Sequence, residues 1–186
     1  MSGTELNGNL GKTLWKALIL DGYFYEKTPN TPKNQGIALT IVILAAISHA
    51  LGSALILLIN RASVPILAIA LLLDSLSVVG GYYFWTLSIW KIGQWLKRHS
   101  LTYKDLLIPI GFAYAPQVLN FLTLIPMLGQ PIQRVLAVWS LLAVIVAVRQ
   151  GLDISTRRAA IICLLGWPVV QVATGLVQVF ERFLSQ

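Results

Sequence analysis

The chain has 186 residues, of which 56% are hydrophobic and only 11% are charged, and its mean hydropathy is +0.74. Soluble domains are typically about 45–50% apolar and about 25% charged, so this composition excludes an ordinary water-soluble domain and predicts a single domain embedded in a lipid bilayer. The net charge of +7 comes from basic residues that lie between apolar runs instead of forming a patch with aromatic residues, so we expect no nucleic-acid partner.

The first 35 residues form an N-terminal segment, 1–35, that precedes the first long apolar run. Lys12 and Lys16 lie on one face of a short helical pattern and apolar residues lie on another, which is typical of an amphipathic helix in the membrane interface. The apolar residues are Leu10, Leu14, Ala17 and Leu18. Trp15 suits the level of the lipid headgroups, where amphipathic rings are favoured. We therefore expect a cytoplasmic, interfacial N-terminal helix, with packing of this helix on the protein's own spans as the alternative.

Five apolar stretches follow within residues 36–181, and they approach the roughly 20 residues that a helix needs to cross a bilayer core about 30 Å thick. They cover residues 36–59, 64–90, 106–128, 132–148 and 159–180. The second stretch is long enough to tilt, and Gly80-Gly81 favours a bend. The third is expected to be irregular because Pro109, Pro116 and Pro126 remove backbone donors. The predicted fold class is all-α: a polytopic membrane protein with a bundle of five transmembrane helices and an amphipathic N-terminal interfacial helix.

The distribution of Lys and Arg predicts the orientation of these spans, because positively charged loops are retained in the cytoplasm. With five spans, eleven of the fourteen basic residues fall on the side of the N-terminus, and only Arg61, Arg134 and Arg182 fall on the other side. We therefore expect an integral, multi-pass protein with its N-terminus in the cytoplasm and its C-terminus on the opposite side. The expected location is a prokaryotic inner membrane or a thylakoid-type membrane.

The sequence contains no motif of an enzyme. Gly11-Lys12-Thr13 resembles the end of a phosphate-binding loop, but the glycine that this loop requires five residues earlier is replaced by Leu6. There is no HExxH, GxSxG or CxxC motif, and the single cysteine, Cys163, cannot form a thiolate cluster for a metal. His49 and His99 do not have the spacing of a metal pair. We expect no catalytic residues, no metal and no cofactor.

Ionisable residues inside the predicted spans are more informative, because such groups are costly in lipid and face a bundle interior or an aqueous cavity. His49 is ten residues from Ile59 and Asp74 is ten residues from Val64, so at about 1.5 Å per residue both lie roughly 15 Å deep. This depth predicts a pair between adjacent antiparallel helices. The same count reaches polar residues on the other three spans, and the predicted intramembrane polar layer comprises His49, Asp74, Gln117, Asn120, Ser140 and Gln171.

Three roles are open for this layer. Hydrogen bonds between polar side chains hold helices together in lipid at about 0.6 kcal/mol each on average, which makes a purely structural role the first. In the second, His49 and Asp74 line a solute or proton path in a small transporter or channel component, with Gly80-Gly81 and Pro116 as hinges. In the third, His49 is an axial ligand to a tetrapyrrole, and the chain is a subunit of a pigment-protein complex.

Three segments in the second half of the chain form a recognisable series. They are Phe112-Ala113-Tyr114-Ala115-Pro116-Gln117, then Ile125-Pro126-Met127-Leu128-Gly129, then Val138-Trp139-Ser140 running into Ala147-Val148-Arg149-Gln150. In this series the chain resembles the Yip (Ypt-interacting protein) family of five-span membrane proteins, and in particular its short bacterial branch. The resemblance implies five spans with an inside N-terminus. Eukaryotic members of that family act with Rab-type GTPases and carry an N-terminal Asp-Leu-Tyr-Gly-Pro motif, which this chain lacks, so that partner is not implied here.

These observations predict a non-enzymatic membrane protein that binds or organises other membrane components, as an accessory or scaffold subunit of a complex or as a membrane-shaping factor. The expected partners are the lipid bilayer and another membrane protein or complex. The residues expected to contact headgroups or a partner are basic or aromatic, and they are Lys12, Trp15, Lys16, Lys97, Arg98, Arg157 and Arg158.

Overall fold

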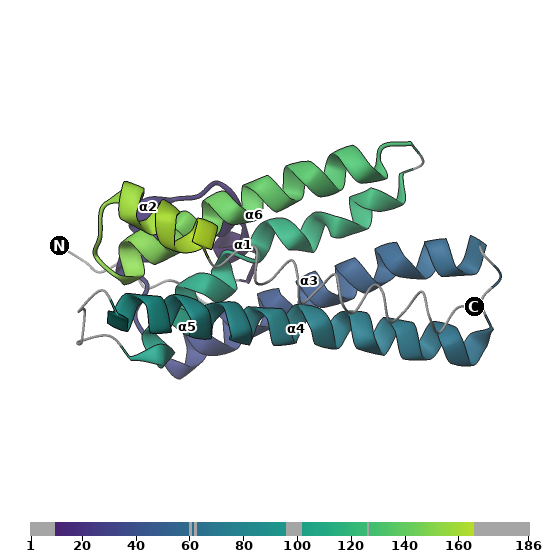
Figure 1. Ribbon diagram of the computed structural model, residues 1–186, viewed down its shortest axis with the longest axis horizontal. Helices are drawn as coiled ribbons and strands as arrows, with labels where there is room; N and C mark the ends of the chain where they lie inside the picture. The colour runs from purple at the N-terminus through teal and green to yellow at the C-terminus, as the bar shows by residue number, and fades with distance from the viewer. Residues whose placement is uncertain (1–9, 60, 62, 96–101, 126, 166–186) are drawn as a thin grey trace.

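The computed structural model describes residues 10–59, 61, 63–95, 102–125 and 127–165, which are almost entirely helical and include no strand (Figure 1). The elements are α1 (Leu10–Leu18), α2 (Gly22–Lys27), α3 (Pro32–Ile59), α4 (Val64–Trp95), α5 (Tyr103–Phe112), the 3-10 helix η1 (Ala115–Leu124) and α6 (Gly129–Gly151). Residues 156–165 are also helical.

Four segments of the described chain are long and apolar enough to cross a membrane, namely α3, α4, the combined segment Tyr103–Leu124, and α6. This confirms the prediction of an all-helical chain with several segments of membrane-spanning length. The fifth predicted span, 159–180, lies mostly outside the described residues, so the number of five remains a prediction.

The first two spans are longer than predicted. Helix α3 begins at Pro32 instead of Gly36, because Thr31 acts as its N-cap: the Thr31 hydroxyl accepts from the Asn34 N–H at 3.3 Å, and proline is favoured in the first turn. Helix α4 extends to Trp95 and stays helical through Gly80-Gly81, where we expected a bend. Counting apolar residues alone missed these polar and aromatic end turns.

The third span is irregular, as its prolines predict. Helix α5 starts with a capping box between Thr102 and Asp105 and ends at Phe112, and the chain then continues as the 3-10 helix η1. The ten residues of η1 exceed the three or four that are usual for this geometry. Pro116 lies in the first turn of η1, where its missing N–H leaves no bond unmade. The span is also the most enclosed of the four, with 67% of its apolar window buried.

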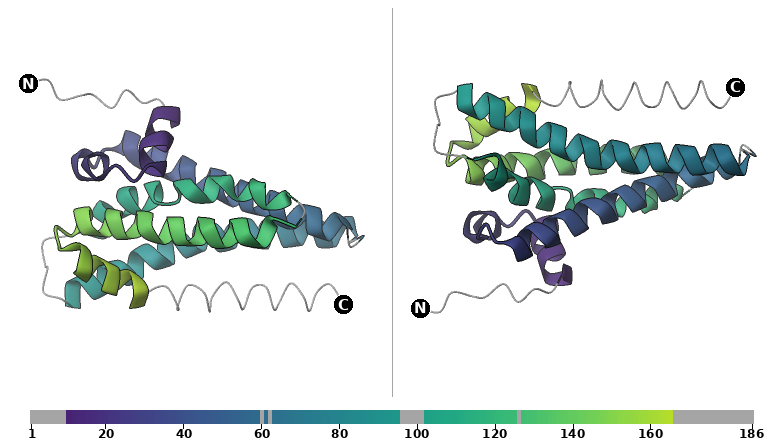
Figure 2. Two further views of the ribbon diagram at one scale, coloured as in Figure 1. Left: turned by 90° about the horizontal axis from the view of Figure 1, so that it is seen from above. Right: turned by 90° about the horizontal axis from the view of Figure 1, so that it is seen from below.

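Helix α3 is the central element, because it packs against α4, α5 and η1 (Figures 1 and 2). Small residues permit this close contact, as is common between helices in membranes. A Cβ added at Gly111 would lie 2.9 Å from the Cβ of Ala38, and one added at Gly52 would lie 3.0 Å from the Thr123 hydroxyl oxygen. The backbones of α5 and η1 can therefore approach α3 only because these positions carry glycine.

The N-terminal helices α1 and α2 pack on one end of the bundle (Figure 2). The Trp139 indole N–H of α6 donates to the Leu18 carbonyl at 3.0 Å, and the Gln150 amide donates to the Gly22 carbonyl at 3.3 Å. Ala17 is fully buried in the same contact, whereas Trp15 is 65% exposed. One face of α1 thus packs on the protein's own spans, which is the alternative left open above, and an interfacial position for the other face remains a prediction.

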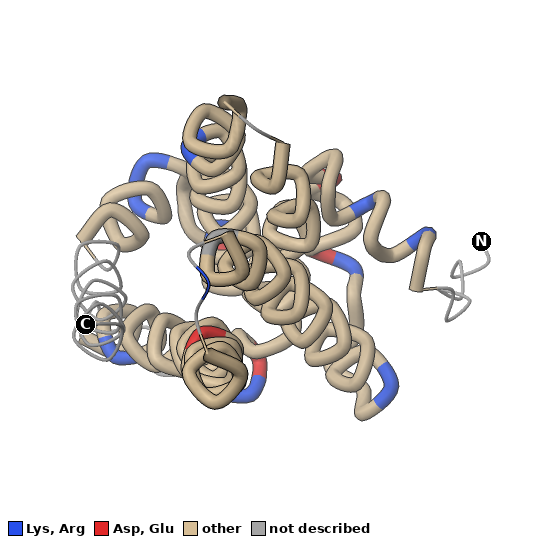
Figure 3. The backbone as a smooth tube through the Cα atoms, turned by 90° about the vertical axis from the view of Figure 1, so that its right-hand side faces the viewer, with Lys and Arg blue, Asp and Glu red and all other residues tan. Residues whose placement is uncertain are grey.

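The antiparallel hairpins divide the charged residues between two ends, and the spans between them carry few charges. Figure 3, viewed from the right-hand side of Figure 1, shows that acidic positions are fewer than basic ones along the described backbone. We call the end that holds α1 and α2 the basic end. Its described basic residues are Lys12, Lys16, Lys27, Lys33, Lys91, Lys104, Arg149, Arg157 and Arg158. The opposite end, where turns join α3 to α4 and η1 to α6, is called the tip end. Its described basic residues are Arg61 and Arg134.

We predict that Gly129→Ala destabilises the protein by about 1–3 kcal/mol, the usual range for an overpacked site. A Cβ at Gly129 would lie 2.5 Å from the Thr123 carbonyl oxygen, and a backbone atom cannot move aside as a side-chain end can. Gly80→Ala is the matched control, because nothing lies within 4 Å of an added Cβ there. This change should stabilise α4 by about 0.5–1 kcal/mol. Thermal unfolding in detergent measures both, and equal effects of the two variants would contradict this packing.

Candidate functional site

The most polar contact between spans joins α3 to α4. His49 Nδ1 lies 3.0 Å from Asp74 Oδ2, and the Ser53 hydroxyl donates to the same carboxylate oxygen at 2.8 Å. His49 and Ser53 are one helical turn apart on α3, so both face the same position on α4. The Asp74 side chain is 12% exposed and the His49 side chain is 32% exposed. This is the pairing of His49 with Asp74 that the depth count predicts.

A second polar contact joins η1 to α6. The Gln117 amide donates to the Ser140 hydroxyl at 2.8 Å, and the Asn120 amide donates to the Gln117 carbonyl oxygen. Asn120 and Ser140 are buried. The Thr123 hydroxyl donates to the Asn120 carbonyl at 2.7 Å and so satisfies a backbone acceptor of the 3-10 helix. Three of the predicted layer residues therefore form one hydrogen-bonded cluster.

Ser48 connects these two contacts. Its hydroxyl oxygen accepts from the Phe121 N–H at 2.7 Å, which ties α3 to η1. Ser48 is adjacent in sequence to His49, and Phe121 is adjacent to Asn120. The structure thus places polar side chains across α4, α3, η1 and α6, in two hydrogen-bonded groups that the Ser48–Phe121 bond connects through the backbone. We call this set the polar row, and its members are Asp74, His49, Ser53, Ser48, Asn120, Gln117 and Ser140.

Two members of the polar row, Ser48 and Ser53, were not among the predicted layer residues. Ser53 could have been found from its position four residues after His49, which places both side chains on one face of α3. Ser48 bonds to a backbone N–H of η1, and no pattern of side chains in the sequence indicates that partner. The last predicted layer residue, Gln171, lies outside the described residues.

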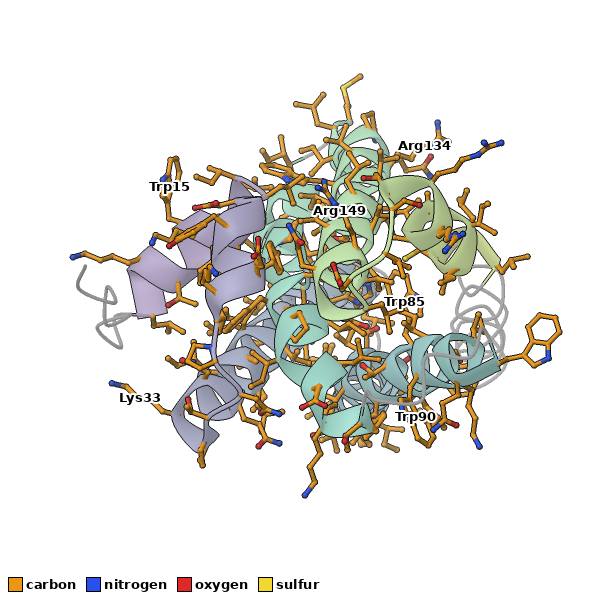
Figure 4. The ribbon with its side chains drawn as sticks, turned by 90° about the vertical axis from the view of Figure 1, so that its left-hand side faces the viewer. Trp15, Lys33, Trp85, Trp90, Arg134 and Arg149 are labelled. Atoms are coloured by element: carbon orange, nitrogen blue, oxygen red, sulfur yellow. The ribbon has the colours of Figure 1, made fainter. Side chains whose placement is uncertain are left out.

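The residues predicted to contact headgroups or a partner gather at the basic end. Lys12, Arg157 and Arg158 are exposed, and Trp15 projects outward from α1 (Figure 4). Lys97 and Arg98 lie outside the described residues. Beneath α1, the Tyr25 hydroxyl donates to the Ala17 carbonyl at 3.4 Å. Burial raises the pKa of Tyr25 above its ordinary value, so this hydroxyl stays protonated and remains a donor at neutral pH.

The chemistry of the polar row is that of hydrogen bonding between side chains. Within the described part of the chain, no three His, Cys, Asp or Glu residues gather where they could hold a metal ion. The Asp74 carboxylate already binds two donors, and the Gln117 amide both donates and accepts. These side chains therefore satisfy one another across the helix interfaces.

Comparison of the chain with models of protein families, with curated proteins and with solved structures finds no match. The resemblance to the Yip family therefore rests on the three sequence segments alone and stays a prediction. The structure gives a reason for the glycine of the second segment. Gly129 packs directly on the Thr123 carbonyl where η1 turns into α6, so there is no room for a larger side chain.

We predict that His49 and Asp74 are energetically coupled. The double variant His49→Ala/Asp74→Ala should be less destabilised than the sum of the single variants by about 0.6–1.7 kcal/mol, from the average to the largest coupling measured for side-chain hydrogen bonds between membrane helices. The measurement is a double-mutant cycle on the free energy of unfolding in detergent or bicelles. His49→Ala combined with Thr86→Ala is the control, because Thr86 lies twelve residues beyond Asp74, about 18 Å along α4. That pair should be additive, and additivity of the His49 and Asp74 effects would refute the coupling.

Proposed function

We propose that this chain is a non-enzymatic integral membrane protein that binds or organises other membrane components, as an accessory or scaffold subunit or a membrane-shaping factor. The observation that carries the proposal is that the polar side chains between the spans bond to one another. A row closed in this way holds the helices in register. Recognition is then left to the surfaces at the ends of the bundle.

The basic end is the surface that we assign to a partner. It presents exposed Lys and Arg side chains beside the exposed ring of Trp15, and Lys33 also projects outward (Figure 4). Such a combination suits the cytoplasmic face of a membrane, where basic residues are attracted to acidic groups and tryptophan rests at headgroup level. We propose that this end faces the cytoplasm and binds an acidic region of another membrane protein.

Charge removal at the basic end tests this proposal. We expect the wild-type protein, isolated in mild detergent, to retain a second membrane protein at a constant ratio. The variant Lys12→Gln/Lys16→Gln/Arg157→Gln/Arg158→Gln should retain at least about fivefold less of it. A factor of about five corresponds to the loss of one basic contact at about 1 kcal/mol. Arg61→Gln/Arg134→Gln is the control, since it removes charge from the tip end only. Equal retention by all three proteins, or retention of no membrane protein, would contradict the proposal.

A transporter or channel component is the second candidate. It is favoured by one observation, namely that His49 is paired with a carboxylate inside a span while its side chain is still 32% exposed. Such a pair resembles the ionisable groups that mark proton paths in membranes. Against it, the Asp74 carboxylate already binds the Ser53 hydroxyl as well as His49.

Proton flux into liposomes separates the two functions. If the scaffold proposal is correct, wild type and Asp74→Asn proteins both give the proton permeability of protein-free liposomes under an imposed pH gradient. A flux through wild type that Asp74→Asn abolishes, with the unfolding temperature unchanged, would replace the scaffold by the transporter.

A further inference from the structure

An open cleft lies between the two hairpins at the tip end. Its volume is about 530 Å³, within the range of about 300–1,000 Å³ that is usual for small-molecule sites. The hairpins α3–α4 and η1–α6 diverge toward this end (Figure 1). Both contribute to the lining, which consists of Gly52, Leu55, Ile59, Thr123, Leu124, Ile125, Met127, Gly129, Gln130 and Pro131.

The cleft is mostly apolar, and its depth fits within one leaflet of a bilayer. Along α3 it runs from Ile59 to Gly52, seven residues or roughly 10 Å, whereas half of a bilayer core is about 15 Å. The hydroxyl of Thr123 is already used by the Asn120 carbonyl, and the other side chain of the lining with hydrogen-bonding groups is the exposed Gln130 of α6, so the remaining lining is apolar. A flexible hydrocarbon chain suits the apolar part of this lining, and Gln130 can bind polar groups near the start of α6.

Basic charge flanks the mouth of the cleft. Arg61 follows Ile59 by two residues, and Arg134 lies one turn beyond the cleft residue Gln130 on α6. Both arginines are exposed, and within the described part of the chain neither has an acidic partner. The segments that form the tip end, residues 59–65 and 124–135, contain no Asp or Glu. Most basic residues of the chain fall on the side of the N-terminus, which is the side expected in the cytoplasm, but these two arginines fall on the other side. The rule that basic loops stay in the cytoplasm therefore does not account for their presence.

We infer that the cleft binds one acyl chain of an anionic phospholipid, with Arg61 and Arg134 facing its phosphate. The apolar lining takes the hydrocarbon chain, and the depth confines that chain to the leaflet at the tip end. The two guanidinium groups favour a phospholipid with net negative charge over a zwitterionic one. This site is independent of the partner surface proposed above, because it lies at the opposite end of the bundle.

Photo-crosslinking with lipids tests the inference. The full chain is reconstituted in phosphatidylcholine that contains a trace of a photoreactive probe lipid. Two probes are compared, phosphatidylglycerol and phosphatidylcholine, and both carry the same diazirine-labelled acyl chain. Adducts are mapped by mass spectrometry. We expect phosphatidylglycerol adducts to concentrate on Leu55, Ile59 and Met127, at about fivefold or more above the phosphatidylcholine probe, the factor expected from one basic residue at an anionic surface.

Two variants with matched loss of charge make the test specific. Arg61→Gln/Arg134→Gln should reduce the phosphatidylglycerol adducts in the cleft to the phosphatidylcholine level, and Lys12→Gln/Lys16→Gln at the basic end should leave them unchanged. Because Arg61, Arg134 and Lys12 are exposed and Lys16 is only half-buried, both variants should keep the wild-type unfolding temperature. Adducts spread equally over the exposed residues Leu72 and Leu76 of α4, equal labelling by both probes, or cross-links between two copies of the chain across the cleft would overturn the inference.

Discussion

A carboxylate in an apolar span is stable only if the protein itself supplies its hydrogen-bond donors, and the arrangement of this bundle depends on that constraint at Asp74. Donors from two turns of α3 meet the Asp74 oxygen, His49 and then Ser53. A shift of α3 by one turn along α4 would leave one of these donors without its acceptor. The constraint therefore fixes the register of the first hairpin, and α3 in turn serves as the surface on which α5 and η1 pack.

In the third span, backbone groups also need hydrogen-bond partners from the protein. A 3-10 helix makes poorer internal hydrogen bonds than an α-helix, and in lipid an unmatched backbone group is costly. Ser48 accepts from the Phe121 N–H and Thr123 donates to the Asn120 carbonyl, so side chains provide what the irregular backbone lacks. The side chains of the polar row thus bond to one another or to the backbone, and we propose the basic end and the tip end as the surfaces for a partner and for lipid.

Much of this arrangement could be predicted from the sequence, and the exceptions have physical reasons. Depth counting paired His49 with Asp74 because helical rise is constant, and Pro116 marked the irregular third span. The apolar pattern carried the second span through Gly80-Gly81 but ended it at residue 90, because counting apolar residues does not include the polar residues of the last turn before Trp95. It also missed the bond from Phe121 to Ser48, since that bond depends on a 3-10 geometry that composition does not specify.

The central claim is that the polar row is a closed structural contact without water, and the accessibility of Ser53 tests it most directly. Ser53→Cys, in a background with Cys163→Ala, is exposed in intact proteoliposomes to a membrane-impermeant, thiol-reactive reagent. The account predicts no modification of Cys at position 53, whereas Ser63→Cys in the exposed turn at the tip end reacts fully. Modification at position 53 at a rate comparable to that at position 63 would show a water-filled path to Asp74 and contradict the account.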